Sequence, residues 1–491
     1  MTIGTGQLMR SSAILLMATM PFWAIEPASS SYHEANSDFA DTQKGTVQGK
    51  SARLGGKPLR EDWAKELGYA AVIPRLSIEA RAGDAMAQFR LGIAYELGQG
   101  VTRDISKAIE LYTQASSRGI SAAWTNLANI YSMGKGGHLD LEKARDLYLK
   151  SAELGDYWAQ NNLGLLYLKG QGIPQDLDEA FYWISEASKA GLVQAKLNEA
   201  AMYRQGQGVP TSAKKAREIY ANAITEGSIE AHVPLGELYE FGEGGERNLK
   251  VAIQHYKIAA EAGDPTGLYY MGTLYEEGAG VERDSDKALG YFMTAADHGF
   301  ALAQYTLGRY YLNGIGVPHD PEKGIDLYFM AADQGLGPAL NDLAVMYEFG
   351  EYLEKDYELA LKLYESAGPS YPLAYANLGL MYLNGYGVEK DNKAAVALFQ
   401  KAADNGEPQG DVLVGKAYLE GLGIEKSSTK AFERFEAAAE KGDPEAFHLI
   451  GWCFETGQGT RKDLKQALYF YKIAAQGGVE ASKKALSRLG E

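Results

Sequence analysis

The chain has 491 residues, of which 46% are hydrophobic and 23% are charged, and these proportions are ordinary for a folded soluble protein. Its net charge of −16, without any run of lysines and arginines, argues against nucleic acid as a partner, because such binding relies on clustered cations. The single cysteine, Cys453, excludes an intrachain disulfide framework, and no two of the seven histidines stand at metal-ligand spacing, so we expect no metal site.

Residues 1–28 fit a secretory signal peptide. Arg10 precedes the apolar stretch SSAILLMATMPFWA, which is too short to span a bilayer, and small residues follow it. An uncleaved anchor and a misassigned start are the alternatives. We expect export to the periplasm or the medium of a bacterium, with no membrane span in the mature chain. Residues 29–60 are rich in Ser, Gly and Gln and predict a flexible linker.

A tyrosine recurs every 36 residues along most of the chain. It stands at Tyr95, Tyr131, Tyr167, Tyr203, Tyr239, Tyr275, Tyr311 and Tyr347, and after one interval of 35 residues at Tyr382 and Tyr418, with Phe454 ending the series. The spacing predicts eleven repeats over 87–480. A capping half-repeat over 61–86 precedes them, and a capping helix over 481–491 follows.

Each repeat contains two stretches with helical spacing of apolar residues, joined by a pair of glycines such as Gly98 and Gly100. Ten of the eleven repeats keep this pair. A phosphate-binding loop requires a strand before the glycines, whereas both flanks are helical here. The glycines therefore predict joints between helices, and we expect no nucleotide or other cofactor.

Three further positions carry the same kind of residue in nearly every repeat, at the start of the second helix or within it. The first position, four residues beyond the second glycine, carries a residue that can cap the N-terminus of the helix: Asp104, Asp140, Asp176, Ser212, Asn248, Asp284, Asp320, Asp356, Asp391, Ser427 and Asp463. Small residues that allow close helix packing follow: Ala108, Ala144, Ala180, Ala216, Ala252, Ala288, Gly324, Ala360, Ala395, Ala431 and Ala467. Aromatic residues fill the next turn in ten repeats: Tyr112, Tyr148, Tyr220, Tyr256, Phe292, Tyr328, Tyr364, Phe399, Phe435 and Tyr471.

The eighth repeat departs from this pattern. Tyr352 replaces its second glycine, and the end of the repeat is one residue short and contains Pro369 and Pro372. An altered turn and an altered helix end in one repeat predict a hinge, or a second binding patch, over 350–373.

The repeat pattern resembles the Sel-one-like repeat family, a relative of the tetratricopeptide repeats. Residues 303–335 and 374–406 match its consensus nearly throughout, and the resemblance covers about four-fifths of the chain. It implies an all-α, α/α superhelical solenoid that acts as an adaptor for other proteins. Cysteine-rich members with β-lactam-binding activity exist, but this chain lacks their paired cysteines, so that activity is not carried over.

Variable positions on the first helices predict the binding face. Two such positions, three residues apart, share one helix face in every repeat, and the resemblance implies that this face lines the concave side. The candidate partner-binding residues are Arg90, Asn126, Asn129, Trp158, Asn162, Asn198, Tyr270, Arg309, Asp342, Asn377 and Trp452. Asn126, Asn162 and Asn198 form a ladder of amides that could hold a peptide backbone, or asparagine is simply tolerated on a solvated face.

The favoured function is a non-enzymatic, exported scaffold that binds proteins or peptides along this face. A periplasmic regulator of signalling or exopolysaccharide export, and a cell-wall or carbohydrate-interacting factor, are the alternatives. We expect no catalytic residues, because each regular aspartate is explained as a cap and no paired carboxylates stand out. Cys453 occupies a core position of its repeat, which predicts a buried and inert thiol.

Overall fold

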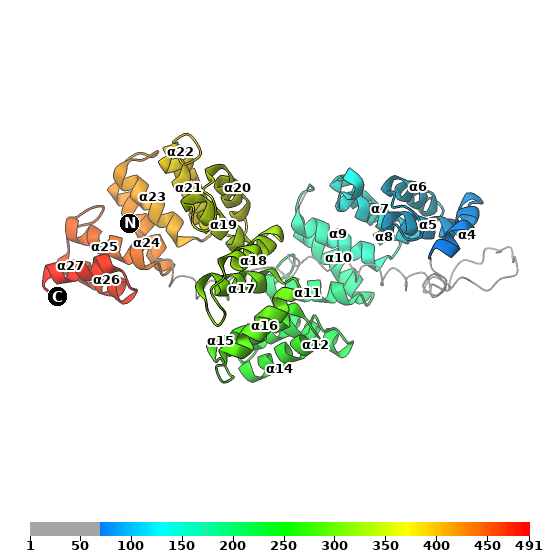
Figure 1. Ribbon diagram of the computed structural model, residues 1–491, viewed down its shortest axis with the longest axis horizontal. Helices are drawn as coiled ribbons and strands as arrows, with labels where there is room; N and C mark the ends of the chain where they lie inside the picture. Colours follow the sequence, from blue (N-terminus) through cyan, green and yellow to red (C-terminus); the bar gives the residue numbers. More distant parts are fainter. Residues whose placement is uncertain (1–68, 171) are drawn as a thin grey trace. The chain divides into compact units, whose positions relative to one another are not determined.

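The computed structural model describes residues 69–170 and 172–491, which belong to two compact units. The first unit ends at Ile258, and the second spans Ala259–Glu491. Every regular element in these residues is a helix, and successive helices pack as antiparallel hairpins (Figure 1). The predicted signal peptide over 1–28 and the predicted linker over 29–60 lie outside the described residues.

Each repeat is one hairpin of a first and a second helix. In the first unit the first helices are α5 (Ala85–Leu97), α7 (Ser121–Ser132), α9 (Tyr157–Lys169), α11 (Val193–Gln205) and α13 (His232–Phe241). Their second helices are α6 (Ile105–Ser116), α8 (Leu141–Glu153), α10 (Leu177–Lys189), α12 (Ala213–Thr225) and α14 (Leu249–Glu261), which crosses the boundary of the units. The helix α4 (Tyr69–Arg81) precedes repeat one, and the 3₁₀ turn η3 (Lys135–Gly137) lies in repeat two.

The second unit continues the series from repeat six to repeat eleven. Its first helices are α15 (Pro265–Glu277), α17 (Ala301–Asn313), α19 (Gly337–Phe349), α21 (Leu373–Asn384), α23 (Pro408–Glu420) and α25 (Pro444–Thr456). Its second helices are α16 (Ser285–Asp297), α18 (Pro321–Asp333), α20 (Tyr357–Ala367), α22 (Asn392–Asp404), α24 (Ser428–Glu440) and α26 (Leu464–Gln476). The helix α27 (Glu480–Leu489) ends the unit. The predicted all-α solenoid of eleven helical hairpins is thereby confirmed.

The predicted caps and joints explain why the helices begin and end where they do. All eleven predicted cap side chains accept a hydrogen bond from a backbone N–H in the first turn of the second helix. The first glycine of each pair has a φ between 61° and 78°, which glycine adopts without steric cost. The second glycine also permits close packing: a Cβ at Gly208 would lie 1.9 Å from the carbonyl oxygen of Leu177, at the start of α10 in the preceding repeat.

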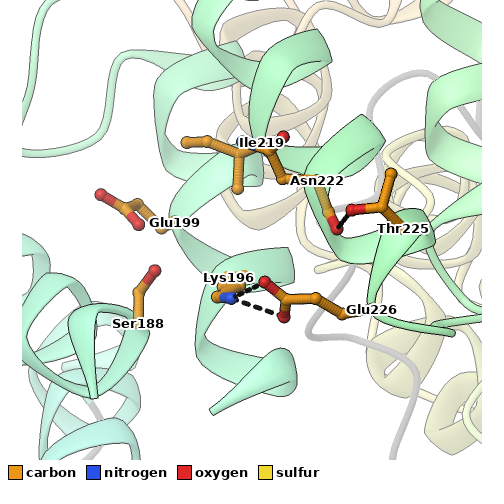
Figure 2. A pocket seen from close by; sticks show the side chains of 7 residues that line it. All are labelled: Ser188, Lys196, Glu199, Ile219, Asn222, Thr225 and Glu226. Carbon is orange, nitrogen blue, oxygen red and sulfur yellow. Dashed lines mark hydrogen bonds and ion pairs between the residues drawn. The ribbon is translucent and has the colours of Figure 1, made fainter. Parts of the chain in front are cut away.

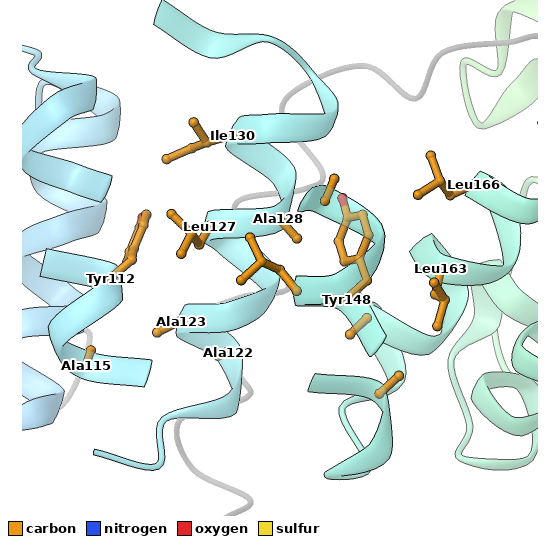
Figure 3. Close-up of a cluster of buried hydrophobic side chains, with 14 of the residues drawn as sticks. Tyr112, Ala115, Ala122, Ala123, Leu127, Ala128, Ile130, Tyr148, Leu163 and Leu166 are labelled. Carbon is orange, nitrogen blue, oxygen red and sulfur yellow. The ribbon is translucent and has the colours of Figure 1, made fainter. Parts of the chain in front are cut away.

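The core lies along the seam between the helices. The alanines of the small-residue column and the aromatic residues that follow them are almost fully buried in both units. Figure 3 shows this arrangement in the first unit, where Tyr112 faces Leu127 and Ala123 from the next repeat. Cys453 is buried in the same way in repeat eleven, so its predicted core position is confirmed, and burial raises the pKa of its thiol to about 12.

Repeat eight keeps the joint despite its altered sequence. Tyr352 has a φ of 65°, the left-handed conformation that glycine adopts elsewhere, and among the described residues no other non-glycine has a positive φ. The helix α20 is shortened to 11 residues, yet one core cluster runs through α19, α20 and α21. The boundary between the two units lies in repeat five instead. The hinge or binding patch over 350–373 stays a prediction.

Candidate partner-binding surface

The predicted binding residues stand on the first helices, and the structure divides them by exposure. Asn126, Asn129 and Asn198 are about 5% exposed and Tyr270 is 8% exposed, so little of these side chains reaches solvent. The other predicted residues are half-buried: Arg90, Trp158, Asn162, Arg309, Asp342, Asn377 and Trp452.

In the first unit, asparagines join the first helices of neighbouring repeats. The Asn162 amide donates to Oδ1 of Asn129 at 3.2 Å, and that oxygen also accepts the hydroxyl of Tyr148. The Asn198 amide donates to Oδ1 of Asn161 at 2.9 Å, between α11 and α9. These bonds tie repeats two, three and four together along their first helices. The predicted grip of the ladder on a peptide stays a prediction.

The second unit carries related bonds at the equivalent positions. The hydroxyl of Tyr305 donates to Oδ2 of Asp342 at 2.8 Å, and the Asn341 amide donates to the other carboxylate oxygen at 3.2 Å. The Asn377 amide then donates to Asn341 at 2.9 Å. Burial raises the pKa of Asp342, because desolvation disfavours its charged form. The first helices of repeats seven, eight and nine are therefore joined in one polar network.

Sequence reasoning missed several residues of these networks. Asn161 and Asn341 are both buried and stand one position before the column of variable residues. They were not predicted because the candidates were chosen from one helix face. His232 and His255 stand 23 residues apart, yet their Nδ1 atoms lie 2.9 Å apart between α13 and α14. No sequence pattern marks that pair, since the contact arises only when the hairpin of repeat five closes.

A small polar hollow lies between α10, α11 and α12 of the first unit (Figure 2). Its volume is about 240 Å³, and it is lined by Ser188, Lys196, Glu199, Ile219, Asn222, Thr225 and Glu226. Lys196 forms an ion pair with Glu226 across it. The charges of this pair neutralise each other, and Ser188, Glu199, Asn222 and Thr225 supply the remaining polar side chains of the lining.

Within residues 69–170 and 172–491, no three or more His, Cys, Asp or Glu side chains come together in a way that could hold a metal ion. The helices of that same part of the chain are all too short or too polar to cross a membrane.

Comparison with known proteins assigns the repeats to a family. The family model described as Sel1 repeat matches residues 85–120, 122–156, 159–192, 195–228, 229–264, 265–300, 301–336, 337–368, 372–407, 409–443 and 444–479. The chain belongs to the Sel1 repeat family. The eleven matched segments agree with the eleven hairpins of the structure, and the family resemblance drawn from the sequence is confirmed.

Solved structures of Sel1 repeat proteins resemble the chain as well. A protective antigen of uropathogenic Escherichia coli that displays this repeat fold is 30% identical, with 85% of this chain and 90% of that chain covered and a TM-score of 0.47. A Sel1 repeat protein of Oxalobacter formigenes is 26% identical, with 50% and 96% covered and a TM-score of 0.45. A search of curated proteins found no match. Sel1 repeat proteins generally mediate protein–protein interactions and are typically non-enzymatic scaffolds.

Proposed function

We propose that this Sel1 repeat protein is an exported, non-enzymatic scaffold that binds partner proteins along the surface of its first helices. The observation that carries this proposal is the continuity of that surface. Hydrogen bonds join the first helices of consecutive repeats in both units, at Asn129 and Asn162 in the first and at Tyr305 and Asp342 in the second. A rigid row of side chains from separate repeats is suited to a long segment of another protein.

Site-specific photo-crosslinking tests the proposed surface. A benzophenone amino acid is placed at Leu380, which is half-buried on the first helix α21, and in a matched variant at Lys362, which is exposed on the second helix α20. We expect an adduct with one defined protein from position 380 and none from position 362. That protein, once purified, should also bind the unmodified chain. Equal adducts from both positions, or none from either, would contradict the proposal.

Export is tested separately. We expect the mature chain to be recovered from the periplasm or the medium, with an N-terminus near residue 29 when sequenced. Recovery of the chain from the cytoplasm with residues 1–28 intact would show that the protein is not exported.

A further inference from the structure

One column of first-helix residues stays half-buried through the whole second unit. It consists of Thr273, Arg309, Val345, Leu380, Lys416 and Trp452, one from each of six consecutive repeats. We call these six residues the open column. Val345, Leu380 and Trp452 each pack against a core cluster with part of the side chain and present the rest to solvent. The open column therefore offers a series of apolar contacts with two cations among them.

The two cations of the open column differ in their surroundings. Lys416 forms an ion pair with Glu445 at 2.7 Å. The guanidinium of Arg309, in contrast, forms no hydrogen bond or ion pair with any residue of 69–170 or 172–491. Arg204 on the first helix α11 of the first unit, by comparison, binds both Glu237 and Glu243.

The polar groups near Arg309 form hydrogen bonds with residues other than Arg309. Its charge is close enough to influence the pKa values of Asp342, Tyr269 and Tyr310. The Asp342 carboxylate accepts its hydrogen bonds from Tyr305 and Asn341, and the Tyr310 hydroxyl donates to Glu276. A half-buried guanidinium with spare donors binds a carboxylate strongly, because the charge-assisted pair can form two parallel hydrogen bonds.

The spacing of the open column suggests the shape of the segment that supplies this carboxylate. Side-chain hydrogen bonds join α17 to α19 and α19 to α21, so these three first helices are neighbours at a spacing on the order of 10 Å. A polyproline II segment advances about 3.1 Å per residue with three residues per turn, so every third side chain returns to the same face after roughly 9 Å. In such a partner segment, the side chain at position i would contact Arg309, the one at i+3 would contact Val345, and the one at i+6 would contact Leu380.

On the basis of the proposed scaffold function, we propose that Arg309 binds an acidic side chain within an extended partner segment whose apolar side chains, three and six residues away, pack on Val345 and Leu380. The net charge of −16 opposes a polyacidic partner, so the segment carries a single acidic residue in an otherwise uncharged stretch. The class of partner is therefore a protein with an exposed, proline-rich and extended stretch of this pattern.

Fluorescence anisotropy with labelled peptides and the full chain tests this inference. The probes are the amidated peptides Gly-Glu-Pro-Ser-Leu-Pro-Ser-Leu-Gly and its reverse, so that either chain direction is covered. We expect one of them to bind, and its affinity to fall at least about tenfold when Glu is replaced by Gln, a change of about 1.4 kcal/mol. Added salt should weaken the Glu peptide more than the Gln peptide.

Variants of the protein complete the test. Arg309→Gln should weaken the Glu peptide at least about tenfold and leave the Gln peptide unchanged, whereas the control Arg283→Gln, an exposed loop arginine of the same unit, should change neither. A circular dichroism melt monitors the fold of each variant. Equal binding of the Glu and Gln peptides, or no binding of either direction, overturns the inference.

The crosslinking experiment at positions 362 and 380 does not involve Arg309, so failure of this inference and failure of the scaffold function can be told apart. If a defined partner is captured at position 380 and Arg309→Gln leaves its affinity unchanged, only the role of Arg309 is wrong.

Discussion

At the scale of single residues, the buried hydroxyl of a second-helix tyrosine is paired with a first-helix glutamate in four repeats. In repeats one, five, eight and eleven the hydroxyl donates to a glutamate at distances of 2.7–2.8 Å. The pairs are Tyr112–Glu96, Tyr256–Glu240, Tyr364–Glu348 and Tyr471–Glu455. Repeats nine and ten carry phenylalanine with leucine at the same two positions. In these six repeats the tyrosine and the glutamate are present together or replaced together, whereas repeat six combines Glu276 with Phe292 and repeat seven combines Leu312 with Tyr328.

This pairing predicts a double-mutant result in repeat eight. Tyr364→Phe removes the donor to Glu348, which is 9% exposed, and should lower the free energy of unfolding by about 1–3 kcal/mol. Adding Glu348→Leu should restore most of the loss, because repeat nine already combines Leu383 with Phe399. Denaturant unfolding of the four proteins measures both effects. If the double variant is as unstable as the sum of the single variants, the two side chains are not coupled.

The histidine pair of repeat five predicts a pH dependence. Burial, together with the neighbouring His232, lowers the pKa of His255 to about 4, and burial lowers the pKa of His232 as well. A lowered pKa in the folded state means that the pair adds stability fully above pH 6.5, and that this stability is lost as the pH falls from 6.5 towards 4. The ring of His255 also stacks on Tyr239, whose other neighbour is the cation of Arg217.

Thermal melts across this pH range provide the measurement. Between pH 6.5 and 4, the melting temperature of the double variant His232→Leu/His255→Leu should fall less than that of the natural chain. Repeat eight, which carries Leu340 and Leu363 at the equivalent positions, shows that two leucines fit this part of a hairpin. The exposed His298→Leu serves as the control. A natural chain with no loss of stability over this range would contradict the prediction.

At the scale of elements, the distance between the two helices of a hairpin is set by a glycine that faces the buried aromatic residue. In repeat six, a Cβ at Gly272 would lie 2.6 Å from the ring of Phe292, which is fully buried. The same contact recurs in repeat seven, where a Cβ at Gly308 would lie 2.7 Å from the ring of Tyr328. The hairpin seam is therefore packed closely enough that one methyl group must move the ring.

Two alanine substitutions in repeat six separate this packing from helix propensity. Gly272→Ala should destabilise the chain by about 1–3 kcal/mol, because overpacking displaces the ring of Phe292. Gly290→Ala, in α16 with no atom near the new Cβ, should stabilise it by about 0.5–1 kcal/mol through helix propensity. Chemical denaturation compares the two. A stabilising Gly272→Ala would show that the seam has spare room.

At the scale of the whole molecule, each repeat depends on its neighbours to cover its core, so the ends need special elements. The last helix, α27, covers repeat eleven: Leu486 and Leu489 pack against a cluster with Tyr471, and Arg488 forms an ion pair with Glu455 at 2.7 Å. The sequence predicted a capping helix over 481–491, and the structure places it at Glu480–Leu489. Ser482 of this helix is fully buried and bonds His448 at 2.8 Å.

Removal of residues 480–491 should therefore loosen one end of the second unit and leave its other repeats intact. Hydrogen exchange should show faster exchange of backbone amides in α25 and α26, because nearest-neighbour contacts are lost there, with no change in α15 and α16. Truncation that speeds exchange equally in all repeats of the unit would show that the unit opens as a single cooperative block.

The sequence alone determined the repeat length, the helix boundaries and the seam of small and aromatic residues, because each of these is local. A cap, a left-handed glycine and an alanine column act within one hairpin and recur in every copy. What only the tertiary structure decided are the contacts between copies: the bond from Asn198 to Asn161, the pair of His232 and His255, and the unpaired donors of Arg309 among the described residues. A pattern along one helix specifies which face is buried. Which polar atoms meet across that face depends on how closely the neighbouring repeat approaches, and only the packed structure sets that distance.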